Sequence, residues 1–240
     1  MKKIIVFLSV GLTFSGFAAA NLSATVQLGS TDYQLSYGYQ GAKEAAIDNT
    51  FLSRDLSLTY TYSPWDIKFG VKLGGLASEE SSTVYGNFIS EYTAKRDENS
   101  IFAIKNVYGI PITFGYYSSS LESKVRDDDG YQADSELNND GFFVSGSYVR
   151  PLADKYGAFA KLGYQTSTVE EKTQYSFNDF EEGYTQEGDG SAWVYGVGLY
   201  YILNAKSSIL ATYEEKSFSY EDDAVEEEMS SFAVAYSYNF

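Results

Sequence analysis

The stretch "DLSLTYTYSPWDIKFGVKLGG", residues 55–75, alternates apolar and polar side chains on both sides of the short break "YSPWD". The apolar positions are Leu56, Leu58, Tyr60 and Tyr62 before the break and Trp65, Ile67, Phe69, Val71 and Leu73 after it. A period of two is typical of β-strands with one apolar and one polar face. Pro64 lies in the break, where its missing backbone donor costs no ladder hydrogen bond. The stretch therefore predicts an antiparallel hairpin.

The same period recurs along the chain, whereas a sustained helical period of 3.6 is absent beyond residue 20. Further stripes are Tyr33, Leu35, Tyr37 and Tyr39; Phe142, Val144 and Tyr148; Ala158, Ala160, Leu162 and Tyr164; Trp193, Tyr195, Val197, Leu199 and Tyr201; Ile209, Ala211 and Tyr213; and Phe232, Val234, Tyr236, Tyr238 and Phe240. Val26 and Leu28 are out of phase with the first of these stripes, which predicts a bulge or a break near residues 29–32. An all-β fold follows.

Short turns and long polar stretches alternate between these strands. The turns are predicted at Pro64, Pro111 and Pro151 and at "LNAKS", residues 203–207, and the long loops at residues 41–50, 75–100, 123–139, 170–190 and 221–229. This order implies ten antiparallel strands with both termini on the short-turn side. A second assignment makes residues 102–116 one strand through Pro111, with "AKRDENS" (94–100) as its turn and residues 83–92 as its partner. That assignment also gives ten strands.

The first twenty residues have the features of a signal peptide. Lys2 and Lys3 precede an apolar run at residues 4–17, and three alanines at residues 18–20 form a small-residue cleavage site. The run is too short for a comfortable membrane-spanning helix, which disfavours an uncleaved anchor. We therefore expect residues 1–20 to be removed and residues 21–240 to form one domain. The absence of cysteine excludes disulfides and thiolate metal sites.

The composition favours a membrane barrel over a soluble β-sandwich or a lipocalin-type barrel. The chain has a formal net charge of −16, and 17% of its residues are aromatic, which is too many for a disordered protein. The polar strand faces are rich in Gly, Ser, Thr, Gln and Lys and suit a packed or hydrated lumen. Aromatic side chains beside the short turns match an interfacial girdle, for which we assign Tyr62, Trp65, Tyr148, Tyr201 and Tyr238. We therefore predict a single antiparallel up-and-down transmembrane β-barrel in the outer membrane of a Gram-negative cell.

Three segments resemble the small outer-membrane barrels of the OmpX and OmpA-transmembrane type. Residues 141–167 and 191–218 and the ending "SSFAVAYSYNF" (230–240) look like the last five strands of that family, and residues 55–75 look like its second hairpin. The family closes with eight strands, so eight is the alternative to ten. The resemblance implies that the terminal stripe Phe232, Val234, Tyr236, Tyr238 and Phe240 is read by the outer-membrane assembly machinery. We expect this stripe to face lipid and its strand to pair with the first strand around residues 33–39.

The sequence contains no histidine, which removes Ser-His and Asp-His nucleophile systems and imidazole metal sites. Barrel proteases, phospholipases, deacylases and palmitoyl transferases rely on a histidine as families, so resemblance to them would fail at the catalytic centre. Carboxylates occur mainly as runs within residues 122–140, 170–189 and 214–228, where a solvated acidic surface is the simpler interpretation. We predict no enzymatic activity, no cofactor, no metal site and no nucleic-acid binding. The segment "RDDDGYQAD" (126–134) resembles a calcium loop only superficially. The alternative to a merely hydrated acidic surface is a weak divalent-cation site that bridges to lipopolysaccharide.

Alternation assigns several charges to the lumen, namely Lys68, Lys72, Lys105, Lys161, Asp55 and Glu214. In a barrel of about ten strands little room is left for bulk water, so these charges are predicted to pair into a polar plug. The alternative is a narrow, anion-preferring pore. The sequence therefore predicts a monomeric barrel in contact with outer-membrane lipid and lipopolysaccharide, which displays acidic loops for a structural or surface-interaction role. The second hypothesis is a small passive channel.

Overall fold

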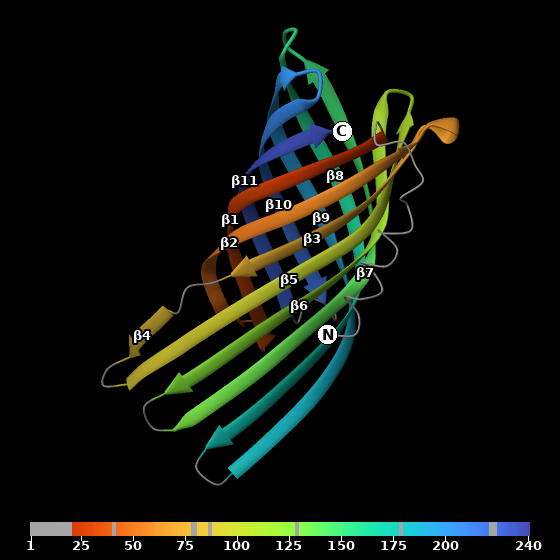
Figure 1. The fold of residues 1–240 in the computed structure, drawn as a ribbon. Coiled ribbons are helices and arrows are strands. Elements are labelled where there is room, and N and C mark those ends of the chain that lie inside the picture. The colour runs from red at the N-terminus through yellow and green to blue at the C-terminus, as the bar shows by residue number, and fades with distance from the viewer. Residues whose placement is uncertain are drawn as a thin grey trace.

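The computed structural model describes residues 21–39, 42–77, 81–85, 88–127, 130–177, 180–220 and 225–240. The signal peptide expected at residues 1–20 lies outside the described residues. Within the described part, ten strands pair into a closed antiparallel barrel, which confirms the predicted fold class (Figure 1). The strands are β1 (Leu22–Tyr39), β2 (Ala42–Tyr62), β3 (Ile67–Ala77), β5 (Phe88–Val107), β6 (Ile110–Asp127), β7 (Tyr131–Pro151), β8 (Tyr156–Phe177), β9 (Phe180–Asn204), β10 (Ser207–Tyr220) and β11 (Val225–Asn239).

The barrel closes at two seams. The ten strands pair in chain order, with β3 joined to β5 over Lys95–Lys105, and β1 pairs with β11. The short strand β4 (Ser81–Tyr85) pairs with β5 farther along, at residues 88–92, so it lies beyond the end of β3. Among the described residues, none of the helical segments is long and apolar enough to cross a membrane.

The seam between β1 and β11 has a register different from the expected one. Residues 230–239 pair with residues 23–32, and the backbone N–H of Phe240 donates to the carbonyl of Leu22 at 3.0 Å. The predicted pairing of the first and last strands is therefore confirmed, but residues 33–37 pair with residues 225–229 and not with residues 230–240. The observed register places Val26 opposite Tyr236 and Leu28 opposite Val234, so apolar side chains of both strands share the outward face.

The prediction of a bulge or a break near residues 29–32 is wrong. β1 pairs with both neighbours without interruption there, and the register shift lies between Leu35 and Ser36, where Ala46 of β2 is the extra residue. Because β1 keeps its phase, Val26 and Leu28 point outward, and Tyr33 points into the barrel, where it is fully buried. The Tyr33 stripe is thus an interior one at its start, not a lipid-facing one.

Short turns lie at one end of the barrel. Pro64 is in a 3₁₀ turn, η2 (Ser63–Trp65), and Asn204 and Ser207 flank the turn predicted at "LNAKS". Between β5 and β6 the turn is Tyr108–Gly109, and both residues have positive φ, 52° and 84°, which favours glycine at the second position. "AKRDENS" lies inside β5, so the assignment of those residues to a turn is wrong.

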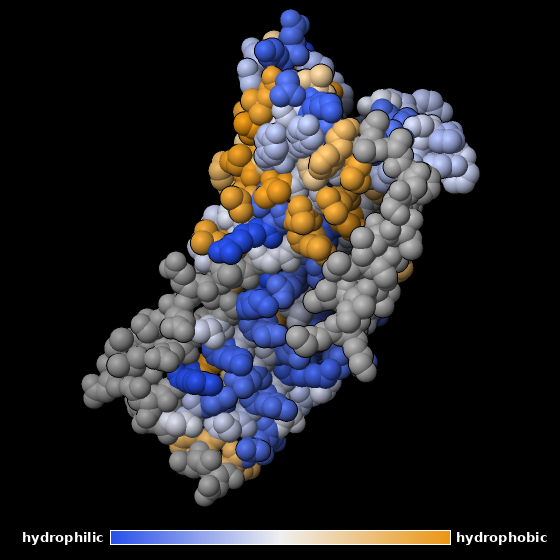
Figure 2. Space-filling model, viewed as in Figure 1, coloured by the Kyte–Doolittle hydropathy of each residue, from blue (hydrophilic) through white to orange (hydrophobic). Residues whose placement is uncertain are grey.

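A belt of apolar side chains surrounds the short-turn half of the barrel. On the face visible in Figure 2 the hydrophobic residues gather toward this end, and hydrophilic residues cover most of the other half. The outward-facing members include Val26, Leu28, Leu56, Leu58, Phe69, Leu73, Ile101, Phe114, Phe142, Val144, Leu162, Trp193, Tyr195, Val197, Leu199, Phe232, Val234 and Tyr236, all exposed. In a soluble sandwich or lipocalin these side chains would point inward, so the exposed belt favours the membrane barrel.

The long polar stretches are mostly strand rather than loop. β8 and β9 contain 22 and 25 residues, whereas a tilted strand crosses a bilayer with about 9–11 residues. The described residues of the predicted loop at 170–190 form the paired ends of these two strands, and those of the predicted loops at 123–139 and 41–50 pair likewise. Residues 41, 128–129 and 178–179 lie outside the described part. Antiparallel pairing continues past the belt because each added residue extends an existing ladder.

Candidate functional site

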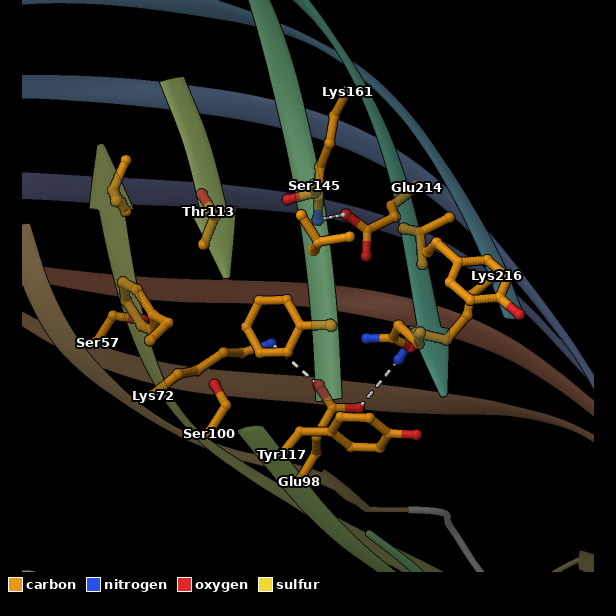
Figure 3. Close-up of a pocket in the computed structure, with 17 residues that line it drawn as sticks. Ser57, Lys72, Glu98, Ser100, Thr113, Tyr117, Ser145, Lys161, Glu214 and Lys216 are labelled. Atoms are coloured by element: carbon orange, nitrogen blue, oxygen red, sulfur yellow. Dashed lines mark hydrogen bonds and ion pairs between the residues drawn. The ribbon is translucent and has the colours of Figure 1, made fainter. Parts of the chain in front are cut away.

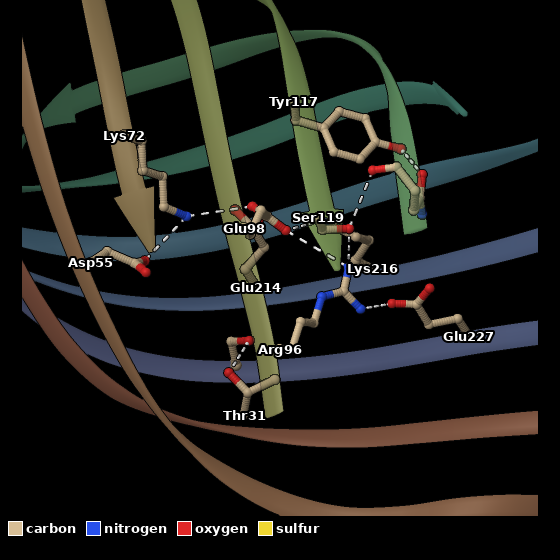
Figure 4. Close-up of polar contacts among 12 residues, drawn as sticks. Thr31, Asp55, Lys72, Arg96, Glu98, Tyr117, Ser119, Glu214, Lys216 and Glu227 are labelled. Atoms are coloured by element: carbon tan, nitrogen blue, oxygen red, sulfur yellow. Dashed lines mark hydrogen bonds and ion pairs between the residues drawn. The ribbon is translucent and has the colours of Figure 1, made fainter. Parts of the chain in front are cut away.

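The barrel interior holds a cluster of charged side chains from six strands. We call it the charged cluster; it consists of Asp55 (β2), Lys72 (β3), Arg96 and Glu98 (β5), Lys161 (β8), Glu214 and Lys216 (β10) and Glu227 (β11). Figure 4 shows all of them except Lys161, which is labelled in Figure 3. Each member lies within ion-pair distance of an opposite charge. Burial of charges is tolerated only when they are paired in this way.

The most buried ion pair joins strands that are far apart in the sequence. Arg96 is 2% exposed and Glu227 0%, and the Arg96 guanidinium donates to the Glu227 carboxylate. The second carboxylate oxygen, Oε2, accepts from the hydroxyl of Tyr220 at 2.8 Å. Asn139 donates to that hydroxyl at 2.7 Å and accepts from Tyr117 at 3.0 Å. The pair is thus part of a hydrogen-bonded chain in which both carboxylate oxygens of Glu227 have donors, whereas the buried Nε of Arg96 has no partner among the described residues.

Glu98 connects this pair to the rest of the cluster. Its Oε2 lies 3.3 Å from Lys216 Nζ and 3.8 Å from Arg96 Nη2, and its Oε1 lies 3.6 Å from Lys72 Nζ. Lys72 in turn contacts Asp55 at 3.1 Å. A separate pair, Lys161 and Glu214, is joined at 2.6 Å. The cluster holds four cations and four anions and is therefore neutral as a whole.

Apolar and aromatic side chains pack against the charged cluster. The core cluster comprises Tyr33, Phe51, Tyr117, Leu121, Leu137, Val169, Ala192, Phe218, Tyr220 and Met229. Its rings contact the cations directly: Arg96 lies 5.6 Å from the Tyr33 ring centroid, and Lys216 lies 5.2 Å from that of Phe218. Burial raises the pKa of the Tyr220 hydroxyl, which keeps it a neutral donor to Glu227.

A cavity of about 270 Å³ adjoins the cluster inside the barrel (Figure 3). Lys72, Lys161, Lys216, Glu98 and Glu214 line it, together with Ser and Thr hydroxyls and the rings of Phe102, Tyr117 and Phe143. Gly70 leaves space for the Phe102 ring, because a Cβ at that position would overlap the ring. The side chains of the cavity wall carry both signs of charge.

The structure brings four of the six predicted lumen residues together: Lys72, Lys161, Asp55 and Glu214. Lys68 shares the phase of Lys72 but is exposed near the short turn of β2 and β3. Lys105 was assigned to the wrong face: it pairs with Ile67 and Ile112, and its ammonium group donates to the backbone carbonyl of Trp65. The two-residue turn at Tyr108–Gly109 reverses the phase between β5 and β6, so Phe102 and Ile104 point inward instead.

Sequence reasoning missed Arg96, Glu98, Lys216 and Glu227. The first two lie in a stretch that was interpreted as loop or turn, and the last two lie in an acidic stretch assigned to the outer surface. One signal was available: Arg96 and Glu98 share the phase of Ser100 in β5, and that polar phase continues the lumen face.

The predicted girdle residues lie near the short-turn end. Trp65, Tyr148 and Tyr201 are exposed, while Tyr62 packs edge-on against Trp65 with ring centroids 5.3 Å apart. Tyr238 is partly covered and packs against Phe240 at 5.2 Å. In the closing strand, Phe232, Val234, Tyr236 and Phe240 are exposed, whereas Ala233 and Ala235 are buried in the interior. Their roles as girdle and assembly signal stay predictions.

Beyond the belt, four strands continue as a sheet with two different faces. We call it the extended sheet: residues 122–127 of β6, 131–138 of β7, 170–177 of β8 and 180–190 of β9. One face, the aromatic face, carries Tyr131, Tyr175, Phe177, Phe180 and Tyr184, and the opposite face carries Asp134, Glu136, Glu170, Glu181, Glu187 and Asp189. On the aromatic face, Tyr184 donates to Glu171 at 3.1 Å, and burial raises the pKa of Tyr184 to about 12.

These features define the class of protein: an antiparallel β-barrel with an apolar outer belt and a polar interior, as in outer-membrane barrels. No protein-family model matches the chain, and no curated protein matches it.

Solved structures of outer-membrane proteins share the fold. The translocator domain of the autotransporter NalP from Neisseria meningitidis is 11% identical, with 100% of this chain and 94% of that chain covered and a TM-score of 0.54. The outer membrane protease OmpT from Escherichia coli is 13% identical, with 93% and 98% covered and a TM-score of 0.57. At these identities the likeness concerns the fold alone. The narrower resemblance to OmpX and OmpA stays a prediction.

Proposed function

We propose that this chain is an integral outer-membrane barrel with a closed interior, whose role is to hold the extended sheet at the cell surface. The observation that carries this proposal is the length of the strands. β8 and β9 continue past the apolar belt as paired strands, and their polar side chains there support a location of that part in water. A rigid acidic projection on a membrane scaffold is suited to contact with other molecules.

The interior supports a structural role for the barrel. Paired charges from six strands and a packed aromatic cluster occupy the space that a wide pore would need. The whole sequence lacks histidine, and the charged cluster consists of mutually paired groups, so we propose that the chain is not an enzyme. We propose that the barrel contacts outer-membrane lipid, lipopolysaccharide and the outer-membrane assembly machinery, and that it acts as a monomer.

Divalent cations are a further part of this proposal. The acidic side chains on the sheet could bridge through Ca²⁺ or Mg²⁺ to the phosphates of lipopolysaccharide. Residues 128–129 of the segment "RDDDGYQAD" lie outside the described residues. Calorimetric titration of Ca²⁺ into the purified barrel tests this idea, and absence of saturable heat would remove it.

The location and orientation can be tested with single cysteines, because the chain contains none. Thr185 is exposed on the extended sheet, and Ala205 is exposed in the turn between β9 and β10. A membrane-impermeant maleimide should label Thr185→Cys in intact cells and Ala205→Cys only after the outer membrane is permeabilised. Recovery of the protein in the outer-membrane fraction, with heat-dependent gel mobility, is expected as well. The reverse labelling pattern, or a soluble protein, would overturn the proposal.

The second candidate function is a narrow channel for small solutes or ions. The observation in its favour is the cavity of about 270 Å³ whose wall includes Lys72, Lys161 and Lys216. Rearrangement of these lysines and their partners would be needed for a continuous path, because the Lys216–Glu98 and Arg96–Glu227 ion pairs join strands on opposite sides of the lumen. Conductance across planar bilayers separates the two candidates.

A further inference from the structure

The aromatic face of the extended sheet is an unusual surface for a part of the protein that lies outside the membrane belt. Phe180 is 61% exposed, Phe177 46% and Tyr184 43%. The rings of Tyr131, Tyr175 and Tyr184 form a row, with Tyr131 and Tyr175 6.2 Å apart and Tyr175 and Tyr184 6.1 Å apart between centroids. Large exposed apolar surfaces of this kind mark interaction sites in soluble regions of proteins.

The charges around this row are negative. Glu171 and Glu182 lie on the aromatic face itself, since they pair across the ladder with Gln186 and Tyr175 respectively. The bases of the sheet lie on the opposite face among the described residues: Lys172 is paired with Glu170 at 2.8 Å, and Lys124 and Arg126 of β6 lie opposite Asp134 and Gln132 in the ladder. An anionic ligand would be repelled by this field, whereas a cation is attracted both by the carboxylates and by the faces of the rings.

The edge of the extended sheet formed by β9 is open to pairing with another strand. In the described residues, β9 pairs with β10 only from Gly190 to Asn204, and residues 180–185 pair with β8 alone. Every side chain from Phe180 to Thr185 is exposed. Main-chain groups on an open strand edge can pair with an added extended segment, with alternate side chains lying on each face.

We propose that the extended sheet binds a cationic polypeptide segment, which lies in extended form along β9 with lysine or arginine side chains over the aromatic face. Tyr175, Phe180 and Tyr184 supply ring surface, and Glu182 supplies the counter-charge. This inference rests on the proposed function, because it requires the extended sheet to face the outside of the cell.

The test uses the barrel purified from outer membranes in a nonionic detergent and a fluorescent peptide of alternating arginine and serine. We expect saturable binding by fluorescence anisotropy at low ionic strength and none with a glutamate–serine peptide. Phe180→Ser should weaken binding about tenfold, and Glu182→Gln about threefold. Glu181→Gln is the matched control: it removes the same charge from the adjacent residue, which lies on the opposite face, and should change binding less than about twofold.

Heat-dependent gel mobility checks that each variant is folded. No binding to the arginine peptide, or equal weakening by Glu181→Gln and Glu182→Gln with no effect of Phe180→Ser, would overturn the inference. Complete displacement of the peptide by spermine at equal charge would overturn the polypeptide part of it. The proposed function is judged separately, by the surface labelling of Thr185→Cys, so either can fail without the other.

Discussion

At the scale of single residues, the stability of the barrel interior depends on buried ion pairs in which the loss of one partner leaves the other as an unpaired charge. Arg96 and Glu227 are both buried, and each would be an uncompensated charge if the other were removed. Breaking a buried pair in this way costs about 3–5 kcal/mol, whereas replacing both partners by apolar side chains of similar size is often close to neutral. The stability of the barrel should therefore respond differently to single and to double substitutions.

We predict that Arg96→Ala lowers the free energy of unfolding by about 3–5 kcal/mol. The measurement is urea unfolding in lipid vesicles, followed by tryptophan fluorescence. Lys95→Ala is the control, because Lys95 is an exposed neighbour whose ion pair is with the exposed Asp97, and it should have little effect. The double variant Arg96→Met/Glu227→Leu should be more stable than Arg96→Ala. Equal stability of Arg96→Ala and the unsubstituted barrel would contradict this account of the interior.

At the scale of elements, the strands divide into a spanning part and a projecting part. The period of two in residues 55–75 correctly predicted β2 and β3, including the face of each side chain, since alternation is a local property of extended backbone. The same alternation did not predict the faces correctly across the turn at Tyr108–Gly109. A two-residue turn pairs Val107 with Ile110, so the inward side chains are at even positions in β5 and at odd positions in β6. Polar composition was a poor guide to loops, since strands outside the membrane can be polar on both faces.

The projecting part of β8 and β9 should be dispensable for folding. Glu171 lies opposite Gln186, so replacing residues 172–185 by Asn-Gly preserves the register of the remaining ladder and supplies a favourable hairpin turn. We expect this variant to reach the outer membrane in normal amount and to keep its heat-dependent gel mobility, but to lose binding of the arginine peptide. Loss of the folded barrel would mean that the projection helps to hold the spanning part together.

The closing strand β11 completes the folded barrel, and we predict that its outward stripe also serves as a signal for membrane assembly; the two roles can be tested separately. Phe240 is 48% exposed and contacts Tyr238, so its ring adds little to the packing of the interior. If the outward stripe is an assembly signal, Phe240→Ser should reduce the amount of protein in the outer membrane several-fold while shifting the unfolding midpoint only slightly. Quantitative immunoblotting of fractions and urea unfolding are the two measurements. Normal outer-membrane levels would disprove the assembly role of Phe240.

At the scale of the whole molecule, the apolar and the acidic surfaces lie at different positions along the barrel axis. The apolar belt surrounds the short-turn half, and the acidic sheet projects from the other end (Figures 1 and 2). Between the two, the neutral charged cluster crosses the lumen. A barrel with this interior is expected to resist passage of ions, since each mobile ion would have to displace a paired charge.

We therefore predict that the unsubstituted barrel shows no stable conductance in planar bilayers. Lys72→Glu places a third carboxylate beside Asp55 and Glu98, which should loosen the cluster and produce intermittent, cation-preferring openings. Lys68→Glu is the matched control, because Lys68 lies in the same strand and phase but outside the charged cluster. Stable channels in the unsubstituted protein, altered by Lys72→Glu, would favour the channel function instead.

Alternation in the sequence favoured ten strands and predicted their membrane-spanning parts and the outward belt, and it assigned Lys72, Lys161, Asp55 and Glu214 to the lumen side, where the structure has them. It took the polar continuations of the strands for loops, because alternation is read within single apolar segments. The contact of Arg96 with Glu227, 131 residues away, and the outward direction of Lys105 were found only in the folded barrel. Contacts across the lumen depend on strand register and barrel closure, because a shift of one residue in a turn or a seam moves every side chain of a strand to the other face.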